Sequence, residues 1–117
     1  MMRPDPKLTK VYLCIEPVDF RKAIQGLSLL VEQSLGLNPF EAALFVFVNR
    51  RRDKIKILYW EKNGFCLWYK RLEKERFKWP RKGQGTIMNL SEDQWRWLLS
   101  GYDIEGHQPL QFASFSG

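Results

Sequence analysis

The sequence has little of what metal sites, disulfide frameworks and histidine-based catalysis require. It contains two cysteines and one histidine in 117 residues. Cys14 and Cys66 lie far apart inside apolar runs, so neither a zinc-ligand spacing nor a disulfide pattern is present. We expect both to be reduced core cysteines. His107 has no neighbouring motif that would make it the base of a nucleophile.

The sequence also lacks a glycine-rich phosphate loop, because the GQG at 83–85 does not have the required spacing. Asp19, Asp53 and Glu61 are conceivable as a carboxylate metal cluster. Each has a sufficient local role, however, as helix cap, turn residue or exposed strand end. We therefore predict a protein that is not an enzyme and that needs no metal or cofactor.

No apolar stretch of about 18 residues occurs, and the first residues, MMRPDPK, lack the apolar segment of a signal peptide. The expectation is a soluble, cytoplasmic protein with no membrane partner. Its length and its hydrophobic content of 44% fit one domain over residues 1–117. Within it, 1–9 is expected to be a flexible arm and 103–117 a loosely ordered tail.

Hydrophobic periodicity predicts a strand at 10–15, ended by Pro17, and then a helix at 19–35 with Asp19 as its N-cap. Gly36 ends this helix. The apolar stripe of the helix contains Phe20, Ala23, Ile24, Leu27, Leu30 and Val31.

Three strand-like runs follow, at 43–49, 54–61 and 65–72, and Asn63-Gly64 between the last two is a strong hairpin signal. A type I′ turn there would place Trp60 opposite Leu67. The predicted fold is α+β: a predominantly antiparallel sheet packed against the N-terminal helix, with a short C-terminal helix.

Alternation gives the two faces of this sheet different characters. The second face is mostly aliphatic, with Lys70 as an exception, and is the expected seat of the 19–35 helix. The first face is an aromatic platform bordered by Lys56 and Arg71. Its members are Phe45, Phe47, Leu58, Trp60, Leu67 and Tyr69.

Two interpretations of the platform remain open. The C-terminal helix, which begins at a Ser91/Gln94 capping box and stops at Gly101, would cover it. Alternatively, some rings stay accessible and stack on nucleobases while basic residues hold phosphates.

The net charge of +6 is concentrated in one third of the chain. Residues 1–49 are neutral overall, residues 50–82 carry thirteen basic and four acidic side chains, and the remainder is net negative. A localised basic segment points to a polyanionic partner. The candidate nucleic-acid-binding residues are Arg50, Arg51, Arg52, Lys54, Lys56, Lys70, Arg71, Lys74, Arg76 and Lys78, with Trp60 and Tyr69 as stacking rings.

Two stretches, EPVDFRKAIQGL at 16–27 and ALFVFVNRRRDKIKILYWEKNGFCLWYKRLEKERFKWP at 43–80, resemble the accessory protein (TnpB or Orf2-like) of bacterial insertion sequences of the IS66 type. The resemblance covers about residues 10–100, and Phe20 stands where a Met is usual. Matching residues are Pro17, Asp19, Arg21, Lys22, Arg51, Arg52, Asp53, Lys56, Trp60, Gly64, Phe65, Trp68, Lys70, Arg71, Phe77 and Pro80.

The resemblance implies a role in transposition, a form of DNA recombination, beside a larger transposase that supplies the catalytic residues. It predicts a non-catalytic helper that binds DNA at the ends of the mobile element, the transposase, or both. The alternative is a pure protein-interaction module that docks on the transposase without contacting nucleic acid. The basic segment fits DNA, RNA or an acidic protein, and the sequence leaves the oligomeric state open.

Overall fold

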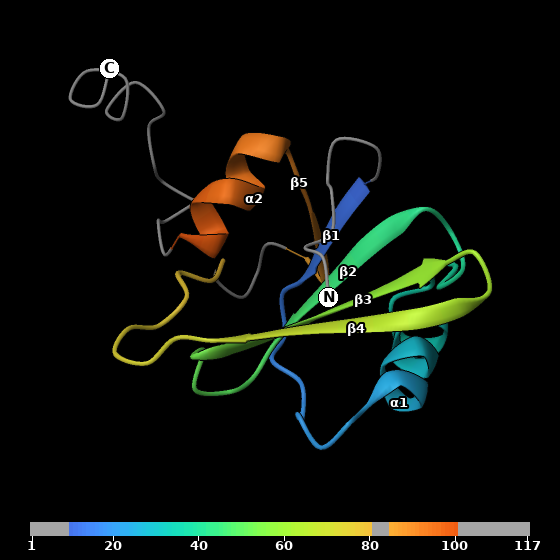
Figure 1. Ribbon diagram of the computed structural model, residues 1–117, viewed down its shortest axis with the longest axis horizontal. Coiled ribbons are helices and arrows are strands. Elements are labelled where there is room, and N and C mark those ends of the chain that lie inside the picture. Colours follow the sequence, from blue (N-terminus) through green and yellow to red (C-terminus); the bar gives the residue numbers. More distant parts are fainter. Residues whose placement is uncertain (1–9, 81–84, 101–117) are drawn as a thin grey trace.

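The computed structural model describes residues 10–80 and 85–100, which form a five-stranded sheet with helices on its two faces (Figure 1). The α+β class is confirmed. The predicted arm and tail lie outside the described residues. The strands are β1 (Lys10–Cys14), β2 (Ala43–Val48), β3 (Lys54–Glu61), β4 (Gly64–Arg71) and β5 (Ile87–Leu90), and the helices are α1 (Ile24–Leu29), its π-helical continuation η2 (Leu30–Ser34), and α2 (Glu92–Leu99).

The sheet is mixed, with strand order β4-β3-β2-β1-β5. The β2–β3 and β3–β4 pairs are antiparallel, as predicted, but β1 runs parallel to β2. A parallel pair needs a long crossover, and the segment containing α1 and η2 provides it. The four-residue strand β5 pairs antiparallel with β1 and was not foreseen.

The β3–β4 hairpin differs from its predicted register by two residues. Glu61 pairs with Gly64 and Trp60 with Phe65, so Lys62 and Asn63 form the connection, with Lys62 at a φ of 53°. The predicted Asn63-Gly64 centre is therefore wrong. Because side chains alternate with a period of two, a two-residue shift leaves every side chain on its predicted face.

The N-terminal helix lies on the opposite face of the sheet from the one predicted. Leu27 of α1 and Val31 of η2 are fully buried against the aromatic face, where they pack with Phe45, Phe47 and Leu58. The centre of the platform is therefore covered by the N-terminal helix. Alternation shows which side chains share a face, but the choice of helix depends on the β1–β2 crossover, which the hairpin pattern does not encode.

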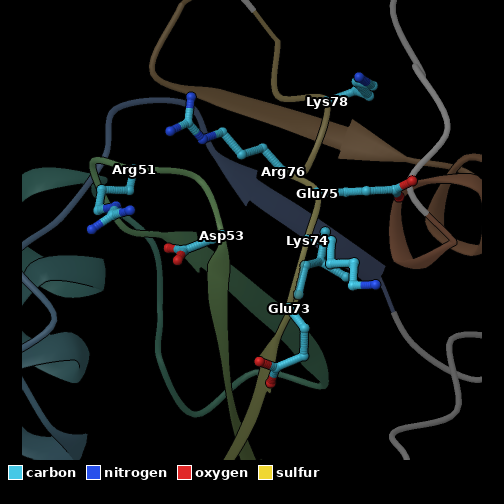
Figure 2. Close-up of a pocket in the computed structure, with 8 residues that line it drawn as sticks. Arg51, Asp53, Glu73, Lys74, Glu75, Arg76 and Lys78 are labelled. Carbon is cyan, nitrogen blue, oxygen red and sulfur yellow. The ribbon is translucent and has the colours of Figure 1, made fainter.

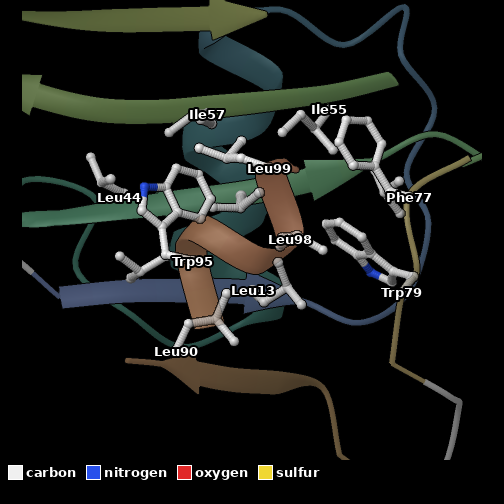
Figure 3. Close-up of a cluster of buried hydrophobic side chains, with 13 residues drawn as sticks. Leu13, Leu44, Ile55, Ile57, Phe77, Trp79, Leu90, Trp95, Leu98 and Leu99 are labelled. Atoms are coloured by element: carbon white, nitrogen blue, oxygen red, sulfur yellow. The ribbon is translucent and has the colours of Figure 1, made fainter. Parts of the chain in front are cut away.

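Helix α2 covers the aliphatic face (Figure 3). Its Trp95 and Leu98 are fully buried against β2 and β3, and Leu99 is nearly so. The predicted capping box is confirmed: Ser91 Oγ accepts from the Gln94 N–H at 3.1 Å, and Gln94 Oε1 accepts from the Ser91 N–H at 2.9 Å.

The N-terminal helix begins later than predicted. Its N-cap is Ala23, which makes no side-chain cap bond, so the Asp19 cap is wrong. The Asp19 carboxylate instead accepts from the Arg21 N–H at 2.9 Å and from its guanidinium. The predicted end is confirmed, because Gly36 follows the C-cap with a φ of 66° that favours glycine.

The chain after β4 explains why rings and cations alternate there. Residues 73–80, here called the strap, carry the buried rings of Phe77 and Trp79 into the core under α2 (Figure 3). The Phe77 N–H donates to Arg52 O at 2.7 Å, and Trp79 Nε1 donates to Cys14 O at 3.1 Å. The intervening cations stay exposed at Lys74, Arg76 and Lys78.

The described part of the chain contains no helix of the length and apolar character needed to cross a membrane. Both cysteines are free. Cys14 is buried, and burial raises the pKa of its thiol to about 11, whereas Cys66 is half-buried.

Candidate nucleic-acid interface

The β2–β3 connection, residues 49–53, is here called the arginine turn. Arg50, Arg51 and Arg52 are all exposed, as the sequence predicts for three consecutive arginines at a turn. Arg52 has a φ of 63°, and its N–H donates to Asn49 O at 3.0 Å. The turn therefore presents three guanidinium groups from a hydrogen-bonded backbone.

Asn49 holds this turn closed from inside. Asn49 as a residue is only 9% exposed. Its Nδ2 donates to Asp53 Oδ1 at 2.7 Å, and its Oδ1 accepts from the Lys54 N–H at 3.0 Å. The Asn49 hydrogen bond lowers the pKa of the Asp53 carboxyl, so Asp53 remains ionised as an acceptor near neutral pH.

The arginine turn is fastened by backbone hydrogen bonds to the strap and to Leu72, the residue just before the strap. Arg52 O accepts from Phe77, and Asp53 O accepts from the Leu72 N–H at 2.8 Å. Between the two segments lies an open hollow of about 560 Å³, here called the strap hollow (Figure 2). Its lining residues are Arg51, Asp53, Leu72, Glu73, Lys74, Glu75, Arg76 and Lys78.

The charges around the strap hollow are not evenly placed. Figure 2 shows Arg76 extending from the strap toward the side on which Arg51 lies, whereas Glu75 points to the other side. Glu73 is engaged by Arg71, with Arg71 Nη2 at 3.1 Å from its Oε2. Two guanidinium groups from separate segments thus border one side of the hollow, where Figure 2 also shows the Asp53 carboxylate, which is already bonded to Asn49. Guanidinium groups are suited to phosphate oxygens.

The loop after β1 borders the other side of the arginine turn. Its Val18 N–H donates to Val48 O at 2.9 Å, which fixes the loop to the end of β2. A second hollow of about 340 Å³, here called the loop hollow, is lined by Pro17, Val18, Asp19, Phe20, Asn49, Arg50 and Arg51. A third, of about 360 Å³, is lined by Glu16, Pro17, Arg50 and Arg52.

Asp19 and Arg21 form an ion pair beside the loop hollow, with Arg21 Nη2 2.6 Å from Asp19 Oδ2. Hydrogen bonds from Arg21 lower the pKa of Asp19 from 3.8 to about 2. Because the folded pKa is lowered, the pair is fully formed above pH 3.8 and is lost only as the pH falls through about 2.

We expect the Asp19 carboxyl carbon to titrate near pH 2 in an NMR experiment, and near its ordinary value in Arg21→Ala. An Asp19 midpoint that stays the same in Arg21→Ala would contradict the paired geometry.

Several candidate residues have structural contacts. Lys56 Nζ donates to Phe20 O at 2.8 Å and Lys22 O at 2.9 Å, and burial lowers the pKa of this amine. Lys70 Nζ donates to Leu99 O at 2.9 Å, which satisfies a carbonyl at the end of α2. These two lysines hold loop and helix in place.

The remaining candidates lie along β3 and β4. Lys54 starts β3 and pairs with Arg71 in the sheet, next to the arginine turn. Tyr69 is 50% exposed on β4. Trp60 lies toward the β3–β4 turn, where its ring centroid is 4.9 Å from that of Phe40 and 5.0 Å from that of Phe65. The fold therefore brings together the basic residues of the arginine turn and of the strap. Trp60 lies away from them.

Three features of this site were not predicted from the sequence: the bond between Asn49 and Asp53, the anchoring of the strap, and the loop at 17–20 beside the arginine turn. Asn49 and Asp53 flank the three arginines, and such Asx residues at a turn commonly bond to nearby backbone. The strap anchors Phe77 and Trp79 alternate with Arg76 and Lys78, which is the pattern of an extended segment with one buried side. No local sequence pattern indicates that the Pro17–Phe20 loop lies next to the arginine turn.

Comparison with known proteins places the chain in a family. The family model described as IS66 Orf2 like protein matches residues 9–109. The chain belongs to the IS66 Orf2-like family. Two similar proteins of Sinorhizobium fredii (strain NBRC 101917 / NGR234) are "Uncharacterized protein y4hO", 35% identical over 87% of this chain and 88% of the relative, and "Uncharacterized protein y4jC", 32% identical over 80% of each. No solved structure matches.

Family membership supports the insertion-sequence context that the sequence motifs indicated. Pro17 and Asp19, from the first stretch of the resemblance, line the loop hollow together with Arg51, from the second stretch, and Arg51 also lines the strap hollow with Asp53. The fold thus brings together residues such as Asp19 and Arg51, which are about thirty positions apart in the sequence.

The Asn49–Asp53 hydrogen bond gives a further prediction about the arginine turn. Asn49→Asp should place two carboxylates against each other and loosen the turn, at a cost of about 1–3 kcal/mol in the free energy of unfolding. Adding Asp53→Asn reverses the direction of the hydrogen bond and should restore most of that loss. Urea unfolding of the two single variants and the double variant measures the coupling; simple additivity of the two losses would show that the bond is not formed.

Proposed function

We propose that the protein is a non-catalytic accessory factor of insertion-sequence transposition that binds the DNA of its element through the arginine turn and the strap. The family supplies the insertion-sequence context. The observation that carries the DNA contact is the placement of Arg51 and Arg76 on one side of the strap hollow, from segments joined by the Arg52–Phe77 backbone bond.

Preorganisation is the physical reason for favouring this surface. Long cationic side chains lose rotamer freedom on binding, so a backbone that is already fixed limits the remaining entropic cost to the side chains. Asn49 fixes the turn, and Phe77 and Trp79 fix the strap, before any ligand arrives. Guanidinium groups on such a frame bind phosphate with two parallel hydrogen bonds.

The test is a salt titration of binding to a duplex that carries a terminal repeat of the element and to a random duplex of equal length. We expect the logarithm of the association constant to fall linearly with the logarithm of salt concentration for both, with a slope of about −0.9 per phosphate contacted. Tighter binding of the terminal repeat at every salt concentration would show that the protein also recognises the DNA sequence. Binding of neither duplex at low salt would contradict the proposal.

A second candidate function is docking on the element's transposase, and the exposed apolar side chains favour it. Phe40 is 54% exposed beside Trp60 and Phe65, and Leu29 on α1 is 43% exposed. In a pull-down with purified transposase, this candidate predicts capture that Phe40→Ala weakens and that Arg51→Ala leaves unchanged. The opposite dependence would favour a DNA-bridged association.

A further inference from the structure

The loop hollow contains motif residues that phosphate binding does not use. Pro17, Val18 and Phe20 give it apolar walls, and the arginine turn forms its opposite side. Arg51 lines both this hollow and the strap hollow, so the two are adjacent. If Arg51 held one unit of a linear polymer, the adjacent unit of that polymer would therefore lie beside the apolar walls.

The two hollows differ in chemistry. The side chains of the strap hollow are charged except for Leu72. In the loop hollow, Asp19 is already paired with Arg21, and the side-chain amide of Asn49 is already bonded to Asp53. A phosphate would gain nothing from the apolar walls, whereas a flat group with apolar faces and polar edges would contact both walls and guanidinium groups.

The walls are formed before a ligand binds. Val18 is fixed by its bond to Val48 O, and Phe20 O is held by Lys56 Nζ, which also lies 4.8 Å from the centroid of the Phe20 ring. The volume of about 340 Å³ lies at the small end of ligand sites, which run from about 300 to 1,000 Å³. One nucleobase is a suitable size for such a site.

We propose that the loop hollow binds one unpaired nucleobase of a DNA strand whose phosphate is held by Arg51. This inference rests on the proposed function and narrows its ligand to DNA with at least one unpaired nucleotide. A base inside a duplex would first have to leave its stack, which costs a few kcal/mol, so single strands and frayed ends are favoured.

The test compares two single-stranded probes of equal length and phosphate number, oligothymidylate and an abasic oligodeoxyribose phosphate, by fluorescence anisotropy at one salt concentration. The native protein should bind oligothymidylate more tightly by about 5- to 150-fold, the range that corresponds to one stacked base. Arg51→Ala should weaken both probes, because both present the same phosphates.

Phe20→Leu keeps an apolar side chain but removes the ring, and Val18→Asp places a charge in the hollow. Phe20→Leu should reduce the preference for oligothymidylate and leave abasic binding unchanged. The added carboxylate of Val18→Asp lies near Arg51, so this variant should remove the preference and also weaken both probes. Phe40→Leu, the same exchange at an exposed ring outside the hollow, is the matched control and should keep the preference. Thermal melting of each variant shows whether folding is retained; if Val18→Asp unfolds the chain, Phe20→Leu decides the outcome.

Equal binding of the two probes by the native protein would overturn the base site. So would an equal loss of preference in Phe20→Leu and Phe40→Leu. In both cases, weakening of both probes by Arg51→Ala would leave the proposed DNA contact standing. Failure of both probes to bind, together with failure of duplex DNA, would instead remove the proposed function itself.

Discussion

Replacing Arg51 and Arg76 together with alanine is expected to remove most DNA binding and to leave the fold unchanged. Both side chains are exposed, so the free energy of unfolding should change by no more than about 0.5 kcal/mol. If each guanidinium contacts one phosphate, the salt dependence on a duplex should flatten by about 1.8 in the log–log slope. Titration of a fluorescent duplex over a series of salt concentrations measures both quantities.

The matched control removes two exposed cations elsewhere, in Lys10→Ala with Arg96→Ala. Lys10 starts β1 and pairs with Ala43, at the end of β2 away from the arginine turn, and Arg96 lies on α2 in ion pairs with Glu92 and Asp93. The control has the same net charge as the arginine variant. Equal loss of affinity in both would mean that net charge, and not the site, determines binding.

Trp95→Ala should cause the largest loss of stability among single substitutions on α2. Its side chain is fully buried between α2 and the aliphatic face of the sheet. Truncation of a buried tryptophan removes a large apolar contact and leaves a cavity, so the free energy of unfolding should fall by about 3–5 kcal/mol. Urea unfolding followed by circular dichroism measures this loss.

Two comparisons make the Trp95 result specific. Trp95 Nε1 is buried and has no hydrogen-bond partner among the described residues, so Trp95→Phe removes an unsatisfied donor while keeping an aromatic ring. It should cost less than about 1.5 kcal/mol. Tyr69→Ala, at a ring that is 50% exposed, should also cost much less than Trp95→Ala. A Trp95→Ala cost below about 1 kcal/mol would contradict the placement of α2 over the aliphatic face.

The sequence predicted which side chains share a sheet face better than it predicted what covers that face. The alternation of Val46, Phe47 and Val48 defines two faces whatever the exact hairpin register, because register shifts of two residues preserve them. The helix that covers each face depends on how the chain crosses from β1 to β2. That crossover is a long-range property, so local periodicity placed the N-terminal helix on the wrong face.

The candidate site was predictable in its charge and not in its geometry. Three consecutive arginines marked an exposed turn, and the structure places them there. Lys56 and Lys70 have structural contacts because each bonds to a backbone carbonyl, Phe20 O and Leu99 O respectively. Both carbonyls are far from the lysines in the sequence, so the sequence did not distinguish these lysines from Arg76. The amino-acid composition does not distinguish cations with structural contacts from exposed ones.

The interleaving of rings and cations at the end of the basic segment has a packing cause that charge analysis alone does not provide. Phe77 and Trp79 are core side chains, and the extended strap turns Arg76 and Lys78 outward as a consequence. One segment thus contributes both to the stability of the fold and to the surface proposed to bind DNA. The two contributions are separable because they come from alternate residues.

The most direct test of the account is an NMR titration of the ¹⁵N-labelled protein with DNA from the end of the element, followed through backbone amide shifts. The predicted result is a set of shifts confined to the arginine turn at 49–53, the strap at 73–78 and the loop at 16–20, which weakens as salt is raised. Shifts centred instead on α1 and on Phe40, or no shifts at low salt, would contradict the assignment of this surface as the DNA interface.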